Sequence, residues 1–151
     1  MRPAALVETR DRPPRQLNLF DYLLLGCWSI WVGSIVFFSF VVAPTVFRVL
    51  GREGAVPLMR ALFPRYYMVG IVTGAVAIAI ALVAHASLLL SVPLVICLVL
   101  VTYARQVLTP AVNEARDADE PERFARLHVL SVRLNMVVLA LLLLAGTVVL
   151  G

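Results

Sequence analysis

Four long apolar stretches, separated by short polar segments, dominate the pattern of hydrophobic and polar positions. They cover roughly residues 20–47, 68–90, 93–108 and 134–150. Each approaches or exceeds the roughly 20 apolar residues that cross a bilayer as an α-helix. The pattern predicts an all-α integral membrane four-helix bundle, with spans at 20–47, 67–90, 93–109 and 122–150. The length suits a single four-span domain over residues 18–151.

The segments outside the spans predict further local structure. Residues 1–17 contain Arg and Pro and too short an apolar run for a signal peptide, so a mobile tail is expected. Asn18 is expected to cap the first helix, with Asp21 in its first turn. Pro44 should kink or end that helix.

Two connections follow from spacing. Apolar residues between the first two spans recur at helical spacing in a stretch too polar to cross, namely Val56, Met59, Leu62 and Phe63. They predict a short amphipathic helix along the membrane surface. The second and third spans are joined by few residues, which predicts a tight hairpin around 91–93.

Small residues recur every three or four positions on two spans, where they allow close contact between helix backbones. They are Gly26, Ser29 and Gly33 on the first span and Gly70, Gly74, Ala77 and Ala81 on the second. The aromatic residues of the first span are expected to face lipid or fill the core: Trp28, Trp31, Phe37, Phe38 and Phe40.

Composition agrees with a lipid environment. The chain is 62% hydrophobic and 15% charged, too little polar surface for a soluble globule. All 13 cationic residues are Arg, and nine lie at the end of the first or third apolar stretch or after it. They flank helices instead of forming a groove with stacking aromatics, so lipid headgroups are the expected partners and nucleic acid is not. Cys27 and Cys97 have no CxxC spacing, and no metal site is expected.

The last helix carries one polar stripe. His128, Ser131 and Asn135 recur at three and four residues, and Arg133 points to a different side. An ionisable group at membrane depth suggests a functional site. The alternative is structural: Arg133 extends its charge to the interface and Asn135 hydrogen-bonds a neighbouring helix.

Four blocks resemble a known family. They are VVAPTVFRVL at 41–50, LFPRYY at 62–67, LTPAVNEARD at 108–117 and FARLHVLSVRLN at 124–135. They are similar to the signature blocks of a bacterial domain-of-unknown-function family related to vertebrate transmembrane protein 205. That resemblance implies a four-span membrane protein, with vertebrate relatives associated with tolerance of platinum drugs, and no catalytic mechanism.

The resemblance and the helix stripe together define a candidate polar site at the Arg-rich face. Its residues are Tyr66, Tyr67, Arg105, Asn113, Arg116, His128, Ser131, Arg133 and Asn135. The resemblance also brings forward Pro64 and Pro110.

Three classes of function fit these features. The first is a transport or metal- or drug-tolerance accessory, the second a structural or assembly subunit of a larger membrane complex, and the third a haem- or copper-dependent membrane redox protein. Met68 and Met136 are the soft ligands available to the third class. His85 and His128 should lie near opposite faces, so one haem between them is not expected. We expect no enzymatic activity and no cofactor.

The expected location is the bacterial inner membrane, with several spans and with homo-oligomer or membrane-protein partners. The side of the N-terminal tail carries four Arg residues, against eight on the other side before Arg133 is counted. This bias favours cytoplasmic first and third loops.

Overall fold

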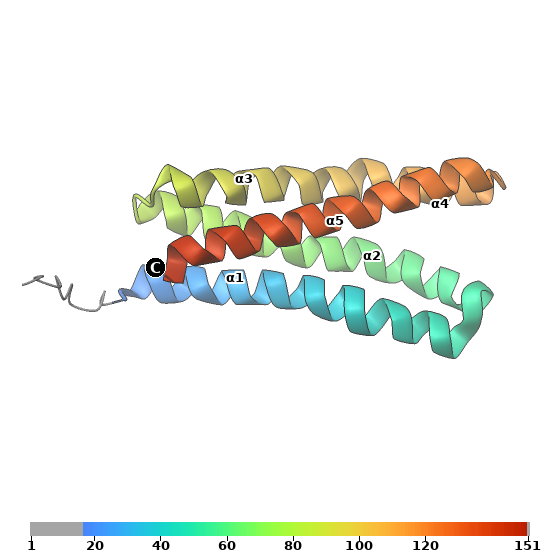
Figure 1. The fold of residues 1–151 in the computed structure, drawn as a ribbon, viewed down its shortest axis with the longest axis horizontal. Coiled ribbons are helices and arrows are strands. Elements are labelled where there is room, and N and C mark those ends of the chain that lie inside the picture. Colours follow the sequence, from blue (N-terminus) through green and yellow to red (C-terminus); the bar gives the residue numbers. More distant parts are fainter. Residues whose placement is uncertain (1–16, 151) are drawn as a thin grey trace, which may run out of the picture.

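The computed structural model describes residues 17–150, and side chains as far as 148; all elements in this part are helical (Figure 1). In chain order they are α1 (Leu19–Phe37), η1 (Phe38–Val42), α2 (Ala43–Val83), α3 (Leu88–Tyr103), η2 (Ala104–Leu108), α4 (Thr109–Asp117) and α5 (Pro121–Leu150). The segments η1 and η2 are π-helical. The all-α prediction is confirmed for these residues, and the predicted tail lies almost entirely outside them.

The first helix begins where the sequence predicts. The side chain of Asn18 accepts a hydrogen bond from the Asp21 backbone N–H, and the Asp21 carboxylate accepts one from the Asn18 N–H, both at 3.0 Å. This reciprocal capping box satisfies two N–H groups that an open helix end leaves without partners.

Each π-helical segment ends two residues before a proline, η1 before Pro44 and η2 before Pro110. The wider turns appear in the backbone bonds, because Ala43 N–H donates to Phe38 O and Thr109 N–H to Ala104 O, each five residues back. A proline removes a donor and crowds the preceding turn, and a wider turn accommodates it. Pro44 therefore does not end the helix.

The chain reverses at Gly51 instead. This residue has φ 65° and ψ 178°, a backbone conformation that residues with a side chain rarely adopt. From there the rest of α2 runs back beside α1 (Figure 1). Val56, Met59, Leu62 and Phe63 are helical, but they belong to no separate short helix: α2 continues through Pro57 and Pro64. Their place along a membrane surface stays a prediction.

The turn between α2 and α3 lies earlier in the chain than predicted, so the predicted position around 91–93 is wrong. It covers Ala84–Ser87, and Pro93 lies inside α3. His85 takes φ 49°, which lets Ala86 N–H close α2 by donating to Ala81 O at 2.8 Å. Histidine is a weak sequence signal for a left-handed residue, and Pro93 removes only one bond of α3, so neither position was evident from the sequence.

The helices close into a ring of neighbours: α1 contacts α2, α2 contacts α3, α3 contacts α5, and α5 contacts α1. Trp31 is only 1% exposed and packs over Gly70 and Gly74, where an added Cβ would lie 2.8 Å from its Nε1 and 2.6 Å from its Cη2. Ala77 and Ala81 are buried on the same side of α2. This face of α2 is therefore in close contact with α1.

Trp28 joins α1 to α5 in a similar way. Its indole Nε1 donates to Leu142 O at 2.7 Å, and its ring covers Gly146. The predicted small-residue face of α1 has a different position: Gly26, Ser29 and Gly33 are exposed, and nothing lies within 4 Å of a Cβ built on either glycine. Within the described chain, no helix packs on that face.

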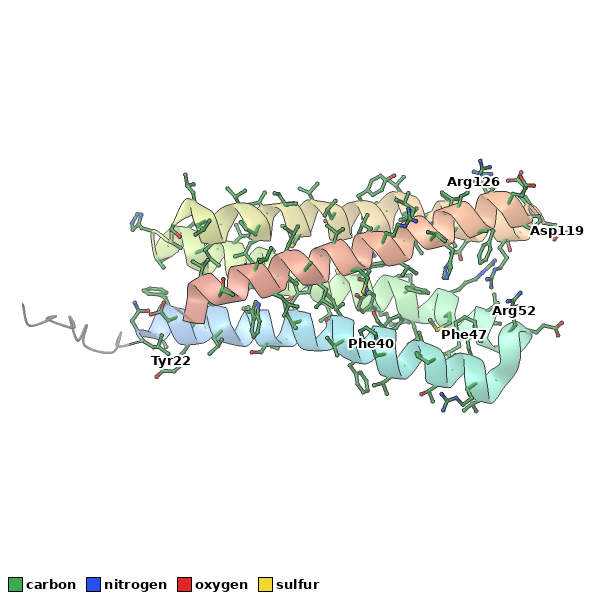
Figure 2. The ribbon with its side chains drawn as sticks, viewed as in Figure 1. Tyr22, Phe40, Phe47, Arg52, Asp119 and Arg126 are labelled. Carbon is green, nitrogen blue, oxygen red and sulfur yellow. The ribbon has the colours of Figure 1, made fainter. Side chains whose placement is uncertain are left out.

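Three helical stretches are long and apolar enough to cross a membrane: Leu19–Val83, Leu88–Asp117 and Pro121–Val148. The first is the stretch that folds back at Gly51. Figure 2 shows Arg52, Asp119 and Arg126 at one end of the molecule and Tyr22 at the other. Over residues 17–150 the protein is thus an all-helical membrane protein with a charged end.

Candidate functional site

A cavity of about 330 Å³ lies at the charged end, between the η1 region, the first half of α2, α4 and the first half of α5. Its polar lining residues are Ser39, Arg60, Tyr66, Tyr67, Thr109, Asn113, Arg116, His128, Ser131 and Asn135. The rest of the lining is aromatic or aliphatic and includes Phe38, Phe47, Met59, Phe63, Phe124, Val132 and Met136. A mainly apolar hollow of this size with a few convergent polar groups is typical of a small-molecule site.

A chain of hydrogen bonds forms its inner end. Tyr66 donates to Asn135 Oδ1 at 2.6 Å, and Asn135 Nδ2 donates to Ser39 Oγ at 3.1 Å. The Tyr67 and Ser131 hydroxyls lie 3.4 Å apart. Both ends of the Asn135 amide are therefore occupied, and this residue ties α5 to α2 and η1.

Four aromatic rings form one wall. Phe38 stacks on Tyr66 with ring centroids 4.4 Å apart, and it meets Phe63 at 5.2 Å. Tyr67 lies 5.0 Å from Tyr66 and 6.2 Å from Phe63. Because the wide turn of η1 carries Phe38 and Ser39, the π-helical segment directly shapes this part of the cavity.

A second group of planar side chains comes from α4 and α5. The Arg116 guanidinium carbon lies 4.4 Å from the centre of the Phe124 ring, and Phe124 stacks nearly parallel to His128 at 5.7 Å. The side chains of Arg116, His128 and Asn113 make no hydrogen bond within residues 17–148. These three polar side chains are thus available to a bound molecule.

Cations outnumber acids beside the cavity. Arg60 forms a two-pronged ion pair with Asp117, and its Nε is buried with no partner among the described residues. Partial burial and the nearby Arg60 and Arg52 charges lower the pKa of Arg116, while the hydrogen bond from Arg60 lowers the pKa of Asp117. Both groups lie at the C-terminal end of the polar helix α4, beyond the apolar part of the stretch Leu88–Asp117, which α3 supplies, and beyond the predicted span 93–109. An anion would relieve the repulsion felt by Arg116.

Seven of the nine predicted site residues line the cavity, namely Tyr66, Tyr67, Asn113, Arg116, His128, Ser131 and Asn135. Arg105 does not, because its Nε donates to Pro64 O at 3.4 Å. Arg133 is exposed and also lies outside the lining.

Several lining residues were not predicted. Ser39 and Phe38 sit inside an apolar run, and Arg60 looked like one of many flanking cations. No local pattern marks them, because their position depends on which helices face each other. Their proximity to Pro44 and Pro64 was the available signal.

Possible metal ligands are scattered in the structure. Met136 and Met59 line the cavity, but Met68 does not. The described residues contain no group of three or more His, Cys, Asp or Glu placed to hold a metal ion. The turn containing His85 lies at the opposite end of the molecule from the start of α5, which contains His128 (Figure 1).

Fold and site together define a helical membrane protein with a cavity at its charged end. The chain belongs to the family described as Domain of unknown function (DUF4149), whose model matches residues 26–121. It is also 31% identical over 123 residues to an "Uncharacterized protein" of Aquifex aeolicus (strain VF5), covering 82% of this chain and 91% of that protein. No solved structure matches. The predicted bacterial family of unknown function is confirmed, and its relation to vertebrate transmembrane protein 205 stays a prediction.

Proposed function

We propose that this protein crosses the bacterial inner membrane four times and binds a small solute in the cavity at its charged end, as a transport or tolerance accessory. In this arrangement the stretch Leu19–Val83 crosses twice, once on each side of Gly51, and the other two apolar stretches cross once each. The proposed role is binding, and it includes no catalysed reaction.

The observation that carries the proposal is the cavity together with its three uncommitted polar groups. Polar side chains near a membrane are normally satisfied by neighbours or water. The side chains of Asn113, Arg116 and His128 line the hollow, are at least partly accessible, and make no hydrogen bond to residues 17–148. Asn135, by contrast, has a structural role, because both ends of its amide are bonded.

Complementation of a deletion strain tests the proposal. His128→Ala and Asn113→Ala should leave the protein inserted and stable while abolishing the activity that the deletion removes. The control is His85→Ala, which changes the exposed histidine in the α2–α3 turn and should complement fully. If both cavity variants complement as well as this control, the cavity is not the functional site.

A structural or assembly subunit is the second candidate, favoured by the open face of α1. A face with glycine and serine at close spacing suits contact with another transmembrane helix. Gly26→Leu would then release a protein partner that co-purifies with the wild type. Loss of a partner without loss of cavity function would assign the two surfaces separate roles.

A further inference from the structure

The two ends of the proposed binding cavity differ in polarity. Its lining on α5 begins at Phe124 and reaches Met136, about 18 Å along the helix at 1.5 Å per residue. The groups without hydrogen-bond partners, Arg116 and His128, lie with Phe124 toward the charged end. From Val132 inward the lining residues of α5 are mainly apolar, and the hydrogen bonds of Asn135 are internal. One end of the cavity is thus suited to a polar group and the rest to an apolar body.

The charge at the polar end has one sign. Two arginines and a histidine line the cavity, and no Asp or Glu does. Asp117, which follows Arg116 in the sequence, is engaged by Arg60. Arg116 has no ion pair within the described residues, and it lies over an aromatic ring that leaves its N–H edge free to donate. A guanidinium with a free edge matches carboxylate and phosphate oxygens in a two-pronged arrangement.

Two large apolar residues of the cavity lining are also exposed at the surface. Phe47 of α2 and Val132 of α5 both line it, and they are 41% and 49% exposed. Figure 1 shows α5 crossing close to α1 near the C-terminal end of α5 and moving away from it toward the charged end. The apolar lining of the cavity therefore continues onto the exposed surface at Phe47 and Val132, where the chain of an apolar molecule could enter.

We propose that the ligand is a single-chain anionic amphiphile, whose carboxylate or phosphate meets Arg116, Asn113 and His128 while its chain lies along the aromatic wall toward Met136. This assignment rests on the proposed function and gives it a substrate class. Both a fatty carboxylate and a lipid phosphate have the required charge and shape.

Three probes with the same sixteen-carbon chain separate these possibilities. Palmitate, hexadecyl phosphate and neutral hexadecanol are added at equal mole fraction to the full-length protein in non-ionic detergent, and the shift in Tm is measured. Ligands that bind only the folded state raise its Tm. At least one anionic probe should raise Tm, and hexadecanol should not. The larger shift identifies whether carboxylate or phosphate is preferred.

Arg116→Gln should lower the affinity for the anionic probe by about ten- to one hundredfold, as expected for a charge-assisted hydrogen bond. The matched control is Arg126→Gln, an exposed arginine on α5 that does not line the cavity and should bind normally. An undiminished shift in Arg116→Gln would overturn the assignment. Stabilisation by hexadecanol equal to that by the anions would keep a solute cavity and remove its anion preference, whereas no stabilisation by any probe would count against the binding function itself.

Discussion

Gly74 and Gly26 provide a matched test of the helix packing. Both are helical glycines, so replacement by alanine should give each a similar gain in helix propensity, about 1 kcal/mol. They differ in surroundings: an added Cβ at Gly74 would lie 2.6 and 2.7 Å from two carbons of the Trp31 indole, while nothing lies within 4 Å at Gly26.

The steric cost should therefore appear in the difference between the two variants. Carbon atoms pack best at about 3.5–4.0 Å, so the Gly74 contact is about 1 Å too short. Trp31 is 1% exposed, so its ring is enclosed by neighbouring side chains that would have to shift with it. Overpacking of this kind costs about 1–3 kcal/mol. A difference of about 2 kcal/mol corresponds to about 4–8 °C in Tm for a chain of this size.

Cys97 supplies the assay, because it is 0% exposed in the folded protein. In a Cys27→Ser background, a dye that becomes fluorescent on reaction with thiols reports unfolding in detergent. Gly74→Ala should unfold at a lower temperature than Gly26→Ala. Equal midpoints, or a lower one for Gly26→Ala, would refute the packing between α1 and α2.

Three further predictions concern charge, orientation and cofactors. Because Arg60 lowers the pKa of Asp117, the ion pair stabilises the fold fully above a pH of about 4, the ordinary pKa of Asp. This stabilisation is lost as the pH falls through the lower pKa of the folded state. The Tm difference between wild type and Asp117→Asn should therefore shrink in acid, and a difference that grows there would contradict this. Single cysteines at Ala4 and Asp119, in a background without native cysteines, should react with an impermeant thiol reagent on intact cells at Ala4 only; the reverse labelling would overturn the orientation. Protein made with ample haem should give no stoichiometric low-spin b-type spectrum lost equally on replacing either histidine, and such a spectrum would require a different helix arrangement.

Local signals predicted much of the fold. Asn18 and Asp21 identify a helix start because the capping box needs only neighbouring residues. The apolar runs predicted helices because membrane spans require continuous apolar sequence. The α2–α3 turn was misplaced because His85 adopts a left-handed conformation that Gly or Asn more often signals.

The sequence likewise predicted only part of the candidate site. Helical periodicity is sufficient to put His128, Ser131 and Asn135 on one stripe of α5. It does not identify what faces that stripe, so Ser39 and Arg60, which come from η1 and α2, were not foreseen. Periodicity also does not separate a bonded side chain from a free one: the Asn135 amide is bonded to Tyr66 and Ser39, whereas the His128 side chain makes no hydrogen bond to the described residues.

Native mass spectrometry of the intact protein, released directly from its own membranes, tests the solute-binding claim most directly. Two α5 variants make the comparison specific: Val132→Trp should fill the cavity, whereas Val129→Trp changes a similarly exposed residue outside its lining. The account predicts a small molecule bound to wild type and to Val129→Trp, and lost from Val132→Trp. A bound molecule retained equally by all three proteins, or a stoichiometric protein partner in its place, would contradict the account.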